Sequence, residues 1–154
     1  MDRHIEAIKQ FRLKAGQGVP DKFAEPTDEQ KILCVKLAME ETLELADELG
    51  VSIDVRSNRC VMYPIQDSDE FSYESVGKVD PVEVLDACCD IFWVSCGGPA
   101  VMLGLGDKLE DCLDEVNSSN LSKFIDGHKD PVSGKWIKGK SYTPANIARI
   151  LNEG

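Results

Sequence analysis

The segment from Asp80 to Gly97 constrains this fold most, because it is predicted to be one helix with apolar side chains around almost its whole circumference. Asp80 is the expected N-cap, Pro81 takes the first helical position, and Gly97-Gly98-Pro99 is expected to kink or break the helix. One narrow stripe is acidic, at spacings i, i+3 and i+7: Glu83, Asp86 and Asp90. The pattern therefore predicts a buried helix that carries carboxylates.

Carboxylates on a buried helix need compensation. An ionised carboxylate taken out of water is costly unless it is paired, and this helix contains no Lys or Arg to pair with Asp86 or Asp90. Oxygen ligands of this kind select hard divalent cations, Mg²⁺ first and Mn²⁺ as a second choice. We therefore expect a magnesium site; a water-filled subunit boundary or protonated carboxyls are the alternatives.

A second acidic helix is predicted from Thr27 to Leu49. Thr27 and Gln30 form a capping box, and Gly50 supplies the C-terminal stop. On a helical wheel, a broad apolar arc lies opposite four glutamates: Glu40, Glu41, Glu44 and Glu48. Like charges four residues apart destabilise a helix unless a cation lies between them. A solvated acidic surface is the alternative, but Leu33 and Leu37 among the glutamates indicate a face that is partly covered.

The remaining predicted elements are short. A helix is predicted over Asp2–Lys14, and a second helix from an Asp107/Glu110 capping box to about Asn117. A hairpin is predicted between them, in which Val51, Ile53 and Val55 precede a Ser57-Asn58 turn and Val61 and Tyr63 follow it. A Gly-rich hairpin around Trp136-Ile137 and a final helix capped by Thr143-Pro144 complete the chain. We predict an all-α fold with small β-hairpins.

Length and composition indicate one soluble domain spanning residues 1–154. No basic region precedes an apolar run at the N-terminus, and no apolar run approaches the roughly 20 residues of a membrane-spanning helix. We expect a cytoplasmic protein that does not contact a membrane. The six cysteines form no C-x-x-C pair, a pattern typical of buried reduced thiols.

The formal net charge of −11 argues against a nucleic-acid binder, since such proteins neutralise phosphates with Lys and Arg. The charge is unevenly distributed: residues 21–120 hold 23 acidic and 7 basic side chains, and residues 121–154 hold 3 acidic and 6 basic ones. One interpretation is a carboxylate metal site together with a basic segment that contacts phosphate; chance asymmetry is the other. Only His4 and His128 are present, so a di-iron carboxylate bundle is excluded.

Four segments carry a family resemblance: Glu-Glu-Thr-Leu-Glu at 40–44, Asp-Ala-Cys-Cys-Asp at 86–90, Asp-Glu-Val-Asn-Ser-Ser-Asn-Leu-Ser-Lys at 114–123 and Gly-Lys-Trp-Ile-Lys-Gly from Gly134. From about Ile32 to Pro144 the chain resembles the MazG-like all-α nucleotide pyrophosphohydrolases, closest to their phage and bacterial phosphoribosyl-ATP-pyrophosphohydrolase-like branch. The resemblance implies a helical bundle completed by dimerisation, as a homodimer or a tetramer of two dimers.

The resemblance also implies site residues. Metal ligands would be Glu41, Glu44, Asp86 and Asp90, and the general base would be one of Glu40, Glu41 and Glu44. The family's E-x-x-D element is matched imperfectly, because Ala87 takes the glutamate position if Asp90 is the final aspartate; Asp86 would substitute. In the alternative register, Glu83 and Asp86 fit the element literally. Candidates for substrate binding are Asn117, Asn120, Lys123, Lys135 and Lys138, although Asn117 and Asn120 are also residues that end helices.

The activity implied is cleavage of a nucleoside triphosphate between its α and β phosphates. Phosphoribosyl-ATP is an alternative substrate. Two other hypotheses are an acidic interaction module whose charge mimics nucleic acid, and a regulatory nucleotide binder without turnover. Phe11, Trp136 and Tyr142 are candidates for stacking on a base, and core packing is their alternative role.

Overall fold

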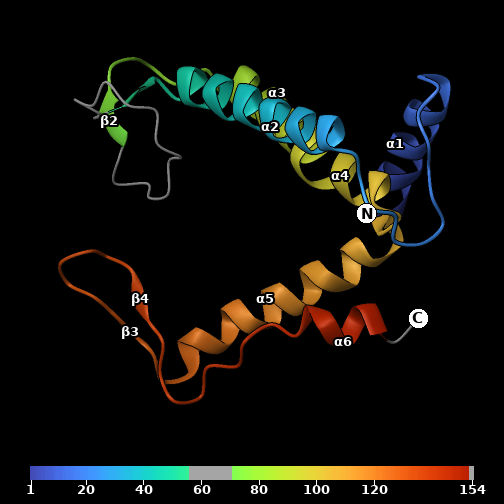
Figure 1. Cartoon of the computed structure of the whole chain (residues 1–154). Helices are drawn as coiled ribbons and strands as arrows, with labels where there is room; N and C mark the ends of the chain where they lie inside the picture. The colour runs from blue at the N-terminus through green and yellow to red at the C-terminus, as the bar shows by residue number, and fades with distance from the viewer. Residues whose placement is uncertain (56–70, 153–154) are drawn as a thin grey trace. The chain divides into compact units, whose positions relative to one another are not determined.

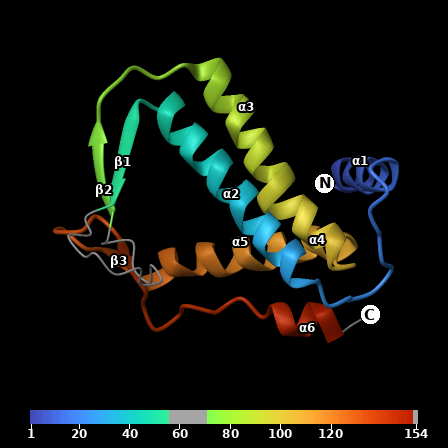
Figure 2. The ribbon, with the colours of Figure 1, turned by 45° about the horizontal axis from the view of Figure 1, so that its top comes forward.

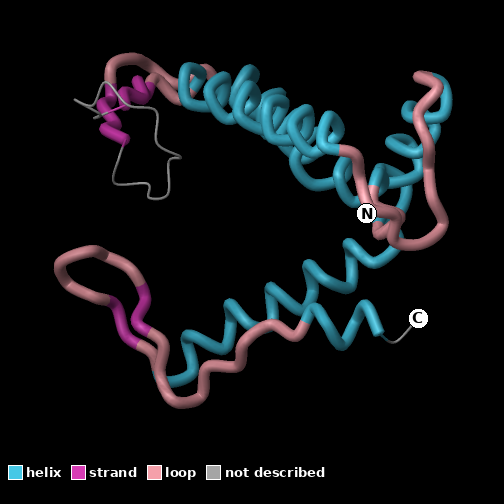
Figure 3. Tube along the Cα trace, viewed as in Figure 1, coloured by secondary structure: helices cyan, strands magenta, loops and turns pink. Residues whose placement is uncertain are grey.

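The structure is a computed structural model that describes residues 1–55 and 71–152 (Figure 1). This part of the chain is largely helical, with two small two-stranded antiparallel sheets, so the predicted all-α class is confirmed in its coarse form (Figure 3). The chain divides into two compact units, Glu25–Pro99 and a second made of Met1–Ala24 with Ala100–Gly154. We call them the acidic unit and the basic unit. The single-domain expectation stays a prediction.

Two long antiparallel helices make up most of the acidic unit. Helix α2 spans Asp28–Glu48, and helix α3 spans Pro81–Ile91 beside it (Figures 1 and 2). The predicted capping box is confirmed: the Thr27 hydroxyl accepts from the Gln30 N–H, and the Gln30 carboxamide accepts from the Thr27 N–H. Asp80 caps α3 as predicted, since its carboxylate accepts from the N–H groups of Val82 and Glu83.

A short hairpin links the two helices. Strand β1, Val51–Val55, pairs antiparallel with strand β2, Phe71–Ser75, and Val51 lies opposite Ser75. Val61 and Tyr63, the predicted partners of the first strand, and the Ser57-Asn58 turn lie outside the described residues. Gly50, which precedes the strand, lies in the left-handed region at φ 68°, and its close contact with Gly77 leaves no room for a side chain.

A kink or a break was predicted at Gly97-Gly98-Pro99, and the break does not occur. Helix α3 continues as a π-helix over Phe92–Gly97 and then as α4, Gly98–Met102. The Gly98 N–H donates to the Trp93 carbonyl, the wide i to i+5 pattern of a π-helix, so the chain passes the proline without leaving the helix. The continuous helix has 22 residues and, by length and composition alone, meets the requirement for crossing a membrane, a test that core helices of soluble proteins also meet. The expectation that no apolar run approaches that length was wrong.

The prediction that α3 is a buried helix was also wrong for the single chain. Only Ala87 of α3 is buried, and Val82 and Leu85 are 70% and 67% exposed. The apolar arc of α2 is exposed as well: Ile32, Val35, Met39 and Leu43. The face of α2 that is partly covered carries Leu37, Glu41 and Glu48 instead. The two helices therefore pack along a partly acidic face and leave apolar faces open.

The basic unit contains helix α1, Asp2–Lys14, the 3₁₀ turn η3, Gly106–Lys108, and helix α5, Leu109–Asp126. The hairpin of β3, His128–Lys129, and β4, Trp136–Ile137, follows α5, and helix α6, Ile147–Asn152, ends the described chain. Ile5, Ile8, Val101 and Ile150 are its buried apolar side chains. Helix α1 and the C-terminal hairpin match their predictions.

Three predictions fail in this unit. Asp107 does not cap a helix, because it lies in the 3₁₀ turn and its carboxylate pairs with Lys9 at 2.7 Å. Helix α5 runs past Asn117 to Asp126, so neither Asn117 nor Asn120 ends it. The final helix is not capped by Thr143: the Asn146 carboxamide accepts from the Arg149 N–H instead.

The cysteines of the described residues are free thiols, as expected, but they are not buried. Cys88, Cys89 and Cys96 are exposed, while Cys34 and Cys112 are half-buried. These three exposed thiols lie, with exposed Val82 and Leu85, on the continuous helix that begins at Pro81.

Candidate functional site

The predicted metal ligands gather where α2 packs on α3. Glu41 is half-buried on the covered face of α2. Its pKa is raised, first by burial and then by the negative charges of Asp90 and Glu44, with Glu40 and Asp86 adding smaller effects. Glu41 therefore lies within electrostatic range of both aspartates of α3. We call these five residues, Glu40, Glu41, Glu44, Asp86 and Asp90, the carboxylate face.

The other four members of the carboxylate face are exposed. The desolvation argument made for Asp86 and Asp90 therefore does not hold in the single chain. The second half of that argument does hold: in the described part of the chain, no Lys, Arg or His forms an ion pair with any of the five carboxylates. Within residues 1–55 and 71–152, no ion pair therefore compensates their mutual repulsion.

The two registers considered for the acidic stripe of α3 fall in different surroundings. Glu83 lies near Glu48, whose pKa is raised by burial and then by the charges of Glu83 and Asp47. Asp86 and Asp90 lie near Glu41 instead. Glu41, the half-buried member of the E-E-x-x-E element, is thus associated with Asp86 and Asp90 and not with Glu83.

The carboxylate face has the donor chemistry of a magnesium site, because it offers oxygen atoms alone. Among the described residues, no three His, Cys, Asp or Glu side chains converge on one point where a metal ion could bind. Ionised carboxylates repel one another, so convergence of this face requires a cation. The chemistry of these donors fits Mg²⁺, and Glu41, Glu44, Asp86 and Asp90 are the residues that could hold it.

A second group of predicted residues comes together in the basic unit. The Lys138 ammonium lies over the Tyr142 ring, 4.2 Å from its centroid, and the charge of Lys123 also acts on the Tyr142 phenol. The Ser119 hydroxyl donates to the phenol oxygen at 3.4 Å. The pKa of Tyr142 is lowered, first by this hydrogen bond and then by that of Lys138. We call Lys123, Lys138 and Tyr142 the basic cluster.

The remaining predicted substrate-binding residues lie around this cluster or apart from it. Asn120 is one helical turn before Lys123, and its carboxamide oxygen accepts from the Lys123 ammonium at 2.6 Å. Asn117 is exposed on α5, and Lys135 is exposed between Gly134 and strand β4. The structure thus joins Asn120, Lys123 and Lys138, and shows no contact that brings Asn117 or Lys135 to them.

Of the three aromatic residues considered for stacking, Trp136 packs edge-on against Phe124, with centroids 4.8 Å apart. Phe11 is 55% exposed on α1. Tyr142 belongs to the basic cluster, through its hydroxyl as well as its ring. Sequence reasoning missed Ser119 and the hydroxyl of Tyr142. The signal was weak, since serine and tyrosine are common and the end of α5 was placed too early.

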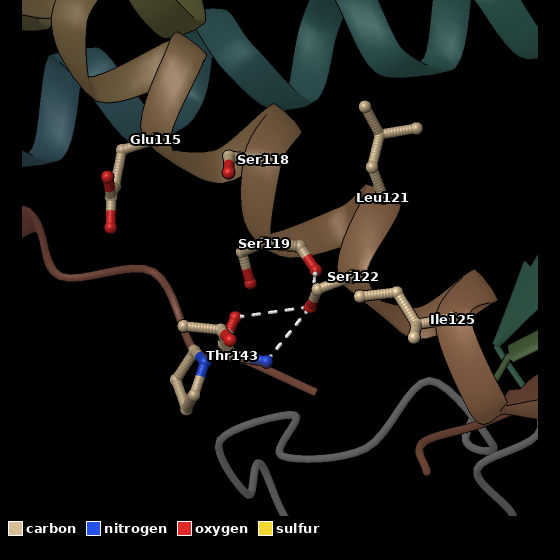
Figure 4. Close-up of a pocket in the computed structure, with 8 residues that line it drawn as sticks. Glu115, Ser118, Ser119, Leu121, Ser122, Ile125 and Thr143 are labelled. Atoms are coloured by element: carbon tan, nitrogen blue, oxygen red, sulfur yellow. Dashed lines mark hydrogen bonds between the residues drawn. The ribbon is translucent and has the colours of Figure 1, made fainter. Parts of the chain in front are cut away.

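Beside the basic cluster, an open pocket of about 430 Å³ lies between α5 and the segment that leads to α6. Hydroxyl groups dominate its polar lining: Ser118, Ser119, Ser122 and Thr143. Figure 4 shows the Ser122 hydroxyl at the centre of a hydrogen-bonded group, donating to the Ser119 carbonyl at 2.7 Å and accepting from the Thr143 N–H at 2.9 Å. Glu115 lines the same pocket but is engaged by Arg149 and the Asn146 N–H.

A comparison with protein families finds no family model that matches this chain, and a search of curated proteins finds no match. The carboxylate face and the basic cluster are therefore the observations on which a function is argued.

Proposed function

We propose that this protein is a magnesium-dependent nucleotide pyrophosphohydrolase of the MazG-like kind, which cleaves nucleoside triphosphates between the α and β phosphates. The observation that carries the proposal is the carboxylate face: Glu41 of α2 is held near Asp86 and Asp90 of α3 without a cationic partner in the described chain. A face of that charge on rigid helices is suited to bind a divalent cation.

Glu41, Glu44, Asp86 and Asp90 would hold the metal, which when bound would neutralise phosphate charge and acidify a water molecule. Glu40 would stay outside that set. As an exposed carboxylate on the same helix, it can accept a proton from the attacking water, and so can any glutamate that is not engaged with metal. Burial, and then the charges of Asp90 and Glu44, raise the pKa of half-buried Glu41.

The basic cluster supports the same function. Lys123 and Lys138 form no ion pair with a carboxylate in the described residues, so both ammonium groups are available to phosphate oxygens. Asn120 orients Lys123 through its carboxamide. Asn117 and Lys135 stay candidates for contacts with the rest of the nucleotide.

A homodimer or a tetramer of two dimers is part of the proposal. Ile32, Val35, Met39 and Leu43 on α2, with Val82 and Leu85 on α3, form apolar faces that are 47% to 70% exposed in the single chain. Soluble proteins rarely leave contiguous apolar surfaces of this kind open, so a second copy packing on these helices explains them. We also propose a cytoplasmic location, where nucleoside triphosphates are the available substrates.

The exposure of Glu40, Glu44, Asp86 and Asp90 favours one other function, an acidic module that occupies the basic site of a nucleic-acid-binding partner. The two functions differ in their response to metal. A metal site predicts that Mg²⁺ raises the melting temperature and that turnover requires it, whereas an acidic module predicts neither.

The proposed activity is tested by incubating the purified protein and Mg²⁺ with a panel of normal, modified and deoxy nucleoside triphosphates and phosphoribosyl-ATP. Pyrophosphate release by the unmodified protein, lost in Glu44→Ala, is the expected result. Pyrophosphate release from phosphoribosyl-ATP alone would show that phosphoribosyl-ATP is the substrate. No release from any member of the panel would overturn the proposal.

A further inference from the structure

Tyr142 is fixed on both sides by hydrogen bonds to α5. On one side, the Asp126 carboxylate accepts from the Ser141 N–H at 3.1 and 3.2 Å and from the Ser141 hydroxyl at 3.1 Å. On the other side, the Thr143 N–H donates to the Ser122 hydroxyl at 2.9 Å. These bonds fix the backbone of Tyr142 against α5, and its phenol oxygen lies 3.4 Å from the Ser119 hydroxyl.

Gly139 and Gly127 permit this close approach. A Cβ added at Gly139 would meet the Asp126 carboxylate, and one added at Gly127 would meet the Lys123 carbonyl. Glycine is therefore required at both positions, where the C-terminal segment passes against the end of α5. That approach brings Lys138, one residue before Gly139, to the side of α5 that carries Lys123.

The phenol can donate a hydrogen bond in electropositive surroundings. Its oxygen lies 3.4 Å from the Ser119 hydroxyl, and with Ser119 as the donor the phenolic hydrogen can be directed to a ligand. Lys138 and Lys123 both stabilise negative charge at this point, since they lower the pKa of the phenol. Neither lysine is neutralised by a carboxylate in the described chain. Two ammonium groups and a phenolic donor on one fixed surface complement a tetrahedral, multiply charged oxyanion.

We propose that Tyr142 is a phosphate-binding residue, donating its phenolic hydrogen to a phosphate oxygen that Lys123 and Lys138 also contact. The proposal deepens the proposed function, because the phosphate would belong to the nucleotide or to the pyrophosphate product. It does not depend on metal or on turnover, since every group involved lies in the basic unit.

The test is calorimetric titration of the full chain with inorganic pyrophosphate in the presence of a chelator, so that neither Mg²⁺ nor hydrolysis contributes. Tyr142→Phe keeps the ring beneath Lys138 and removes only the hydroxyl. We expect it to weaken binding by about tenfold, the effect of losing one charge-assisted hydrogen bond. Tyr73→Phe, on exposed strand β2 of the other unit, is the matched control and should bind like the unmodified protein.

Lys138→Met provides a second variant, expected to weaken pyrophosphate binding even if Tyr142→Phe misfolds. Equal affinities of the unmodified protein and Tyr142→Phe, or no binding by the unmodified protein up to about 10 mM pyrophosphate, would overturn the inference. If the triphosphate panel shows no hydrolysis while Tyr142→Phe still weakens pyrophosphate binding, the proposed activity fails and this inference stands. If the triphosphate panel is hydrolysed but Tyr142→Phe binds pyrophosphate as the unmodified protein does, this inference fails and the proposed activity stands.

Discussion

Each of the two units carries a local cluster of like charges, and the clusters have opposite signs. In the acidic unit, neighbouring carboxylates raise the pKa of half-buried Glu41. In the basic unit, neighbouring ammonium groups contribute to the lowered pKa of Tyr142. Some other charges in the described chain are paired, as Lys9 is with Glu6 and Asp107. Carboxylates are suited to a divalent cation and ammonium groups to phosphate, so the two clusters call for different ligands.

The largest effect is expected from removing carboxylates. Glu41→Gln or Asp90→Asn should lower kcat for pyrophosphate release by about 10²- to 10⁴-fold, because each removes a candidate metal ligand or base. Steady-state kinetics at saturating Mg²⁺ measure this. Glu74→Gln on exposed strand β2 is the matched control. An equal loss of kcat in that variant would show that the overall negative charge of the protein, and not the carboxylate face, determines activity.

Removing the lysines should act differently. Lys123→Met and Lys138→Met should raise KM by about tenfold and change kcat less, since they remove phosphate contacts that exist before the transition state. Lys129→Met, on strand β3 of the same hairpin, should leave both constants unchanged. A fall in kcat with constant KM would contradict the division of roles between the two units.

Metal binding to the carboxylate face should raise the melting temperature of the protein. At about 100 times its Kd, Mg²⁺ should raise the melting temperature by about 5–10 °C. Glu41→Gln should melt higher than the unmodified protein without metal, because it relieves repulsion by Asp90 and Glu44, and should lose most of the Mg²⁺ response. Differential scanning fluorimetry with and without a chelator measures both. A full Mg²⁺ response in Glu41→Gln would place the metal elsewhere.

The smallest effect concerns the attachment of α6 to α5. Glu115 accepts from the Asn146 N–H at 2.8 Å and from Arg149 at 3.2 Å, and its pKa is lowered, first by the Asn146 hydrogen bond. Its stabilising contribution is present above its unfolded-state pKa and is lost as the pH falls through the lowered folded-state pKa. Glu115→Gln should therefore melt slightly lower than the unmodified protein at neutral pH and equally in acid. A difference that persists in acid would contradict this pKa shift.

Local signals predicted the elements well where the chain caps its own helices. Thr27 with Gln30, and Asp80 before Pro81, define α2 and α3 because a cap is satisfied within a few residues. Asp107 showed the limit of this reasoning. Its carboxylate is engaged by Lys9, 98 residues away in sequence, and a partner at that distance outcompetes the local capping box.

Burial could not be predicted from periodicity. The apolar circumference of α3 predicted a buried helix, yet α3 meets α2 along a narrow face around Ala87 and stays exposed elsewhere in the single chain. An amphipathic pattern shows which surface of a helix is apolar. It does not show whether the same chain or a second copy covers that surface. Glu41 lies within electrostatic range of Asp86 and Asp90, and their joint binding of a metal ion stays a prediction.

The most direct test of the account is product analysis with the most reactive nucleoside triphosphate, comparing the unmodified protein with Glu44→Ala in Mg²⁺ and in a chelator. We predict equal amounts of nucleoside monophosphate and pyrophosphate from the unmodified protein in Mg²⁺, and neither product in the chelator or from Glu44→Ala. Release of inorganic phosphate with a nucleoside diphosphate, or pyrophosphate release that Glu44→Ala retains, would contradict it.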